Sequence, residues 1–147
     1  MKKIFKYFFL AAVASLALGC QKPDHEPIHT DNLIREILMY STSTPEELDG
    51  LPLPQPVRGV INQETGEIKF PIPKDLRPRT NSEGKRIVQI DPSRVKLRAT
   101  VGYDVKITPS LLGIHDLSEQ DKFSVDVLAV QTGEAKHYTM YAYFSRN

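Results

Sequence analysis

The chain has 147 residues, of which 25% are charged and 40% hydrophobic, and its formal net charge is +1. This length predicts one domain and little more. The near-neutral charge argues against a nucleic-acid-binding protein, which usually carries a basic stripe. The single cysteine excludes a disulfide within the chain, so stability must come from an apolar core, which a domain of this size can supply.

The first nineteen residues have the pattern of a targeting segment. The start is positively charged, through Lys2, Lys3 and Lys6. The apolar stretch 8–18 that follows is too short to span a hydrocarbon core of roughly 30 Å. The segment closes on Gly19 and Cys20, and Ala17 and Gly19 are small enough for a signal-peptidase pocket.

This junction resembles the lipobox of bacterial lipoproteins, in which the cysteine becomes the first mature residue and carries acyl chains, palmitate among them. One departure is Ala17, because the family usually has leucine there and here Leu16 stands one step earlier. The resemblance implies that residues 1–19 are a signal peptide and that Cys20 is lipidated. Two or more acyl chains hold a protein stably on a membrane. An ordinary secretory signal is the alternative.

Removal of such a signal leaves sixteen Lys and Arg against eighteen Asp and Glu, a formal charge of −2. Residues 20–31 then predict an extended tether, because they are mostly polar and include two prolines. His25-Glu26-Pro27-Ile28-His29 matches the H-E-x-x-H string of zinc proteases. Pro27 disfavours the helix that this motif needs, so we interpret the match as a coincidence and expect no metal site. Asp24 and Glu26 resemble only weakly the acidic export signal of surface lipoproteins in Bacteroidota-type bacteria.

After the tether, residues 31–40 fit two structures. Their apolar positions 33, 34, 37 and 38 fit one helical face with Asp31 as a cap, and the pattern alone does not separate helix from strand. The segment Pro45 to Leu48 predicts a short helical turn.

Beyond the tether the dominant period is two, with apolar and polar residues in alternation. The alternating apolar positions are Ile68, Phe70, Ile72, Val95, Leu97, Ala99, Val101, Phe123, Val125, Val127, Ala129, Tyr138, Met140, Ala142 and Phe144. Such alternation predicts antiparallel strands with one face in a core and the other toward water.

Glycines at 66 and 133 predict tight hairpins, since each supplies the positive φ of a short turn. Proline-rich stretches at 51–56 and 70–73 favour extended edges and corners. Residues 77–86 predict a polar loop.

Three segments are similar to recurrent phrases of Bacteroidota lipoproteins and together cover most of residues 33–144. They are 105–118, with its I-x-P-S-x-x-G-x-x-D-L-S pattern, the hairpin carrying Ala129, Gly133, Lys136, Tyr138 and Met140, and the hairpin carrying Ile61, Gly66, Ile68, Phe70, Ile72 and Pro73. The resemblance implies an all-β, immunoglobulin-like antiparallel β-sandwich over residues 32–147, in a domain family of unknown function. It makes 33–42 the first strand and 77–90 an insertion that protrudes.

The sequence offers no recognisable catalytic set, so we expect no enzyme activity and no cofactor. It has no free thiol once Cys20 is lipidated, no G-x-S-x-G elbow and no phosphate-binding glycine loop. His115 beside Asp116 is interpreted as a surface residue, because sequence neighbours usually point apart. Glu46 and Glu47 are interpreted as a solvated helical turn.

A ligand-binding surface is the alternative to a purely structural role. His137, Tyr141 and Tyr143 are expected on the outer face of the last strand, where aromatic rings can stack on a sugar or another protein. The plainer interpretation is that tyrosine is a good strand former. The basic residues of the 77–86 loop are interpreted as solvated, with an anionic glycan or lipid headgroup as the alternative. They are Arg77, Arg79, Lys85 and Arg86.

These observations predict a lipid-anchored, non-catalytic accessory or interaction module of an outer-membrane assembly. A surface glycan-binding module is the alternative. The expected partners are the membrane, through the N-terminal lipid, and an envelope protein or a glycan. The expected location is the outer membrane, on its cell-surface or periplasmic face.

Overall fold

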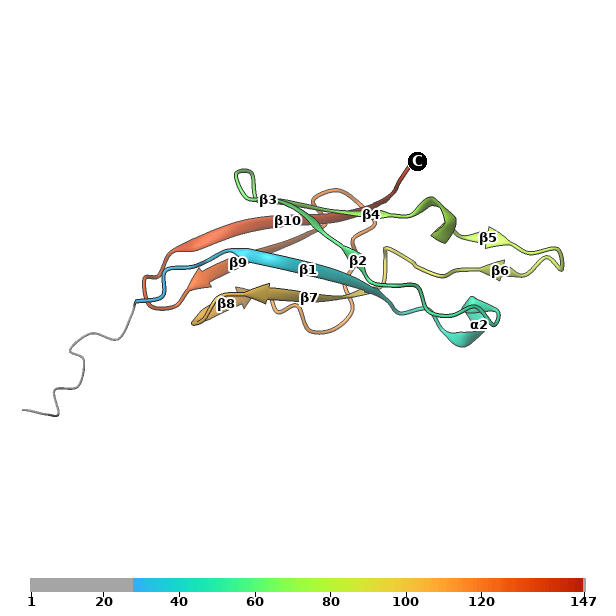
Figure 1. Ribbon diagram of the computed structural model, residues 1–147, viewed down its shortest axis with the longest axis horizontal. Coiled ribbons are helices and arrows are strands. Elements are labelled where there is room, and N and C mark those ends of the chain that lie inside the picture. Colours follow the sequence, from blue (N-terminus) through green and yellow to red (C-terminus); the bar gives the residue numbers. More distant parts are fainter. Residues whose placement is uncertain (1–27, 147) are drawn as a thin grey trace, which may run out of the picture.

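The computed structural model describes residues 28–146, which form two β-sheets packed face to face, with a small hairpin at one end (Figure 1). The predicted all-β sandwich is therefore confirmed. The predicted signal peptide, Cys20 and most of the predicted tether lie outside the described residues.

The first sheet has the strand order β2-β1-β7 and is antiparallel throughout. Its strands are β1 (Ile34–Ser41), β2 (Val57–Arg58) and β7 (Val95–Val101). The segment that fitted helix or strand on pattern alone is thus a strand, as the resemblance implied. The segment is extended because β1 pairs with β7 along its whole length. A bulge between Ile34 and Glu36 interrupts the register of this pairing once.

The second sheet has the order β3-β4-β10-β9-β8. Its strands are β3 (Val60–Asn62), β4 (Glu67–Ile72), β8 (Val105–Thr108), β9 (Phe123–Ala129) and β10 (Ala135–Phe144). The pairs within it are antiparallel except β4 with β10, which run parallel. This parallel pair departs from the antiparallel prediction and brings residues of β4 beside the last strand.

The alternating apolar residues point into the space between the sheets, as predicted. The fully buried side chains include Ile34, Ile37, Met39, Ile68, Phe70, Ile72, Val95, Val125, Tyr138 and Met140. The phenol of Tyr138 is satisfied inside this core, because it donates to Gln63 Oε1 at 2.7 Å and accepts from the Ile34 N–H at 3.2 Å. Burial raises the pKa of this phenol.

The chain between Val57 and Asn62 passes from the first sheet to the second at Gly59. A Cβ placed on Gly59 would lie 2.6 Å from Ile37 Cγ2 and 3.0 Å from atoms of Ile68 and Phe70. The crossing therefore needs a residue without a side chain, because both sheets pack against its backbone.

The predicted 77–90 insertion is a short hairpin at one end of the sandwich, as Figure 1 shows. It follows the 3₁₀ turn η1 (Lys74–Leu76) and pairs β5 (Arg79–Thr80) with β6 (Arg86–Ile87). The polar loop predicted over 77–86 is followed by residues that do not protrude, since Ile87, Val88 and Ile90 are buried.

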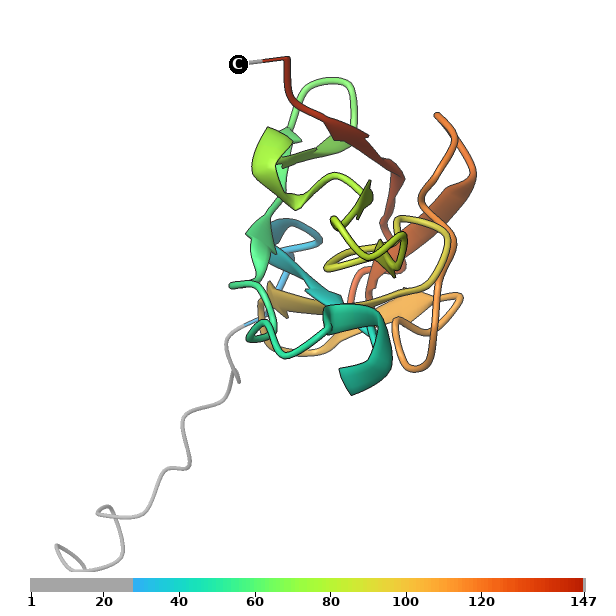
Figure 2. The same ribbon diagram turned by 90° about the vertical axis from the view of Figure 1, so that its right-hand side faces the viewer.

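The predicted helical turn is α2 (Pro45–Leu48), and it lies at the same end of the molecule, which faces the viewer in Figure 2. Thr44 and Glu47 form a capping box, in which each side chain accepts from the other residue's backbone N–H. The Glu47 carbonyl also accepts from Val88 N at 2.9 Å, which joins α2 to the insertion.

The opposite end is where the described chain begins. His29 N donates to Gln131 Oε1 at 2.8 Å, and the His29 ring lies 5.7 Å from the Tyr103 ring. Asp31 pairs with Arg35 at 2.5 Å. The last residues of the predicted tether thus contact the sandwich.

Candidate functional site

The three residues predicted to bind a ligand share the outer face of β10. Tyr138, Met140 and Ala142 point into the core, and the residues that alternate with them point away from it. His137 and Tyr143 are exposed and Tyr141 is half-buried, with Tyr143 at 43% of its full accessibility.

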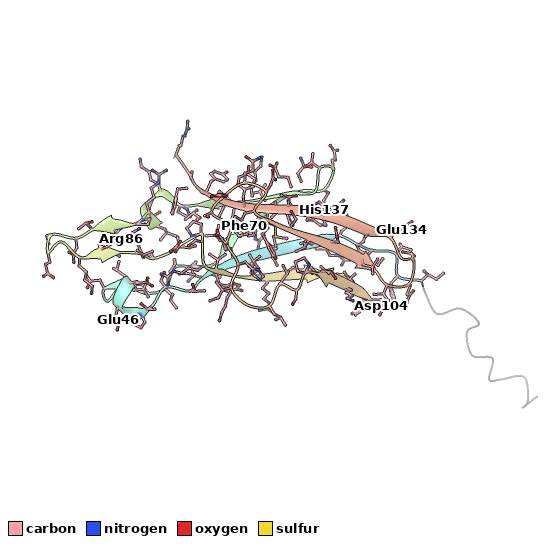
Figure 3. All side chains as sticks on the ribbon, turned by 180° about the vertical axis from the view of Figure 1, so that it is seen from behind. Glu46, Phe70, Arg86, Asp104, Glu134 and His137 are labelled. Carbon is pink, nitrogen blue, oxygen red and sulfur yellow. The ribbon has the colours of Figure 1, made fainter. Side chains whose placement is uncertain are left out.

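His137 is nevertheless separate from the two tyrosines. Its Nδ1 lies 2.8 Å from Asp126 Oδ1 on β9, the residue directly opposite in the ladder. A strand rises about 3.3 Å per residue, so His137 and Tyr141 are roughly 13 Å apart along β10. Figure 3 shows His137 toward the Glu134 end of the strand. The structure therefore brings together two of the three predicted residues.

The rings of Tyr141 and Tyr143 lie 6.2 Å apart, tilted by 39°. Lys69 on β4 stands opposite Tyr141 in the parallel register, and its Nζ lies 5.9 Å from the centre of that ring. This is cation–π distance. Lys69 also pairs with Glu67 at 2.8 Å. The hydrogen bond to Glu67, and then that to Tyr141, raises the pKa of Lys69, so the ammonium stays charged.

A shallow, open depression of about 720 Å³ continues this face past the end of the strands. Pro71, which stands opposite Tyr143, forms part of its wall. The other lining residues are Pro73, Lys74, Asp75 and Ser145. We call the rings of Tyr141 and Tyr143, Lys69 and this depression the aromatic surface.

Sequence reasoning missed the β4 part of the aromatic surface. Lys69 and Pro71 are remote from Tyr141 and Tyr143 in the chain, and only the parallel pairing of β4 with β10 makes them neighbours. The alternation of β4 predicted that Lys69 faces outward, but alternation carries no information about which strand lies beside it.

Three of the four basic residues of the insertion, Arg77, Arg79 and Lys85, have partners within the domain. The Arg77 guanidinium lies 5.6 Å from the centre of the Phe144 ring, and Arg79 donates to the Asp75 carbonyl at 3.1 Å. Lys85 pairs with Asp49 at 2.5 Å. These contacts favour a structural role for the segment over an anion site.

His115 is half-buried rather than on the open surface, because its ring packs 4.4 Å from the Phe123 ring. Its Nε2 lies 3.0 Å from the Leu111 carbonyl oxygen. Asp116 turns to other partners: it accepts from the backbone and hydroxyl of Ser118 and pairs with Lys122 at 3.1 Å. The Ser118 bonds, and then Lys122, lower the pKa of Asp116 to about 2. The two neighbours therefore do not interact as an acid–base pair.

Glu47 was expected to be solvated, but its carboxylate has two partners within the domain. Its carboxylate accepts from the Thr44 N–H and pairs with Arg94, which holds a second contact to Asp91 at 3.2 Å. The bond from Thr44, with a smaller contribution from Arg94, lowers the pKa of Glu47. These residues tie α2 to the start of β7.

Within residues 28–146, no three His, Cys, Asp or Glu side chains are grouped so that they could hold a metal ion. The histidine-containing string of the tether falls mostly outside this range. The same range contains no helix with the length and apolar character needed to cross a membrane.

Comparison with known proteins shows what the chain is similar to. No family model and no curated protein matches the chain. A crystal structure of a protein designated as secreted, from Bacteroides fragilis NCTC 9343, superposes with a TM-score of 0.49 at 13% identity. The alignment covers 82% of this chain and 100% of that one.

Proposed function

We propose that this protein is a non-catalytic interaction module, held at the outer membrane by acyl chains on Cys20, and that it contacts its partner through the aromatic surface. The observation that carries the proposal is the cluster of Tyr141, Tyr143 and Pro71 on one open face beside a depression. Exposed apolar and aromatic patches of this kind mark partner surfaces.

The placement of this surface suits an anchored protein. The described chain starts at the end of the sandwich where β1 begins, and β10 runs from that end toward the other (Figure 1). Tyr143 is the next-to-last residue of β10. A tether leaving from the start of β1 would therefore hold the aromatic surface away from the membrane, open to a partner.

A glycan is the second candidate for the ligand. Sugar rings stack on aromatic side chains, and polar groups around the stack then fix orientation. Tyr141 and Tyr143 supply two adjacent rings, while Lys69, Lys74 and Asp75 supply charged groups at the border. The same residues would serve a protein partner, so the ligand class has to be decided by experiment.

The test compares the wild type with the Tyr141→Ala/Tyr143→Ala double variant, using protein purified in mild detergent. Tyr103→Ala is the matched control, because Tyr103 is 82% exposed and belongs to the turn between β7 and β8. Glycan-array binding that the double variant loses and the control keeps would assign a glycan. If the double variant loses one cross-linked envelope protein that the wild type and the control retain, and no glycan binds, the ligand is a protein. Equal binding by all three proteins would refute the role of the aromatic surface.

The anchor is tested separately. Mass spectrometry of the mature protein should show fatty acyl groups on Cys20 and an absence of residues 1–19. Cys20→Ala should move the protein from the membrane fraction to the soluble fraction, since the acyl chains supply the attachment. A mature protein without acyl groups would refute the anchoring.

A further inference from the structure

The strand β7 is an open edge of the first sheet. The two sheets of the sandwich have four edge strands, and β7, with seven residues, is the longest of them. The others, β2, β3 and β8, have two, three and four residues. Short edges resist pairing with other chains, whereas a long one offers a row of free backbone groups.

The backbone of β7 already shows which residues point outward. Val95 exchanges two hydrogen bonds with His115, at 2.9 and 2.8 Å, on the side away from β1. Backbone groups alternate in direction along a strand, and the β1–β7 register is regular from Val95 to Thr100. The N–H and C=O groups of Leu97 and Ala99 therefore point the same way as those of Val95. Among the described residues no strand pairs with β7 on that side.

An apolar groove of about 380 Å³ runs beside these free groups. Leu97 and Ala99 of β7 form one wall, and Ile107 of β8 with Leu111 and Leu112 forms the other. Leu112 is 89% exposed. An extended chain that paired with Leu97 and Ala99 would bury its inward side chains against Ile107 and Leu111, and would continue the ladder that His115 begins.

The charges around the groove indicate what kind of chain fits. Lys96 and Arg98 alternate with the apolar residues of β7, and Lys106 precedes Ile107 on β8. None of the three belongs to an ion pair of the described residues. The carboxylates of Glu36 and Asp116 do not neutralise them, because these are paired with Arg58 and Lys122. Arg98 lines the groove itself, and no carboxylate does. The site thus complements a segment with acidic side chains.

We propose that the β7 edge accepts an extended, acidic segment of another protein by β-strand addition. In this mode the main chain supplies hydrogen bonds and alternate side chains supply specificity. The partner would alternate apolar residues, directed into the groove, with Asp or Glu directed toward Lys96 and Arg98. A second copy fits poorly, because antiparallel pairing of two β7 strands would bring their cations together, and like charges across a ladder destabilise it.

This site is independent of the aromatic surface, which lies on the second sheet. It can be probed in the full-length protein in mild detergent with a capped eight-residue peptide of alternating valine and glutamate. The peptide should bind with protection of the Leu97 and Ala99 amides from hydrogen exchange. The matched peptide of alternating valine and lysine should not bind, and added salt should weaken binding of the acidic peptide.

Two variants report on the two parts of the site. Ala99→Pro removes an outward N–H without removing a bond to β1, and should weaken binding of the acidic peptide tenfold or more. Arg98→Glu reverses the charge in the groove and should weaken binding comparably without any proline effect on folding. Lys69→Glu, on the other sheet, is the control and should leave peptide binding unchanged.

Several outcomes would overturn the proposal. They are failure of the acidic peptide to bind at millimolar concentration, equal binding by Arg98→Glu, and binding that leaves both amides unprotected. Concentration-dependent dimerisation that Ala99→Pro abolishes would show instead that β7 pairs with a second copy. Loss of glycan or partner binding in the tyrosine variants has no bearing on these results, so the two proposals fail separately.

Discussion

Gly66 and Gly133 offer a matched pair for testing how tightly the second sheet is packed at its turns. Both have positive φ, 72° and 75° respectively. A Cβ on Gly66 would lie 2.2 Å from the carbonyl oxygen of His137, whereas a Cβ on Gly133 would meet nothing within 4 Å. Alanine at each site therefore carries the same backbone strain, and only alanine at 66 collides with β10.

The magnitude follows from these two contributions. The left-handed conformation costs alanine about 1–2 kcal/mol, and the loss of glycine's unfolded-state entropy offsets roughly 0.4–1 kcal/mol at both sites. At Gly66 the added Cβ must also retreat by roughly 1 Å to reach an ordinary contact. That movement lengthens the hydrogen bond from Thr139 N to the Gly66 carbonyl, which is 2.9 Å long in the structure. Weakening this hydrogen bond costs about 1 kcal/mol of stability. We expect Gly66→Ala to lower the free energy of unfolding by about 1–2.6 kcal/mol and Gly133→Ala by about 0–1.6 kcal/mol, so that the two variants differ by about 1 kcal/mol.

Guanidinium chloride unfolding of the wild type and both variants measures the difference directly. The exchange of the Thr139 amide should also quicken in Gly66→Ala and stay unchanged in Gly133→Ala. Equal losses of stability in the two variants would refute the reasoning, because the contact between Gly66 and the His137 backbone would then contribute nothing.

Further predictions concern the buried phenol and one carboxylate. Tyr138→Phe should lower the free energy of unfolding by about 1–3 kcal/mol, because it removes the acceptor of the buried Ile34 N–H and leaves Gln63 Oε1 with only the longer contact to Lys136 Nζ at 3.4 Å. Tyr143→Phe, at an exposed hydroxyl, should change the free energy of unfolding by less than about 0.5 kcal/mol. The folded-state pKa of Asp116, about 2, lies below its ordinary value of 3.8, so its contribution is present above pH 3.8 and is lost as the pH falls through 2. Asp116→Asn should therefore unfold with a weaker pH dependence than the wild type over this acidic range, and an unchanged dependence would contradict the assignment.

The strands of the core were predictable because a strand with one buried face alternates apolar and polar residues in the sequence. The positions of β4, β7, β9 and β10 follow from alternation, and the turns at Gly66 and Gly133 follow from the φ that only glycine adopts easily. The segment 33–42 was different, because its apolar spacing fits two periods. Only the resemblance to a known family assigned it to a strand.

The candidate site was predictable in part, and for a related reason. Alternation along β10 placed His137, Tyr141 and Tyr143 on its outer face, which the burial of Tyr138 and Met140 supports. It did not show that Asp126 engages His137 or that Lys69 stands beside Tyr141, because both contacts come from neighbouring strands.

The sequence by itself determined which residues of the alternating segments point inward and where the chain turns, because each depends on local residue chemistry. It also predicts Cys20 as the site of lipid attachment. Tertiary structure alone decided the parallel pairing of β4 with β10, the burial of Ile87 and Ile90 and the open edge of β7. These depend on which segments meet across long separations in the chain. Periodicity indicates the face of a strand on which a side chain lies, but it does not indicate which neighbouring strand or side chain it contacts.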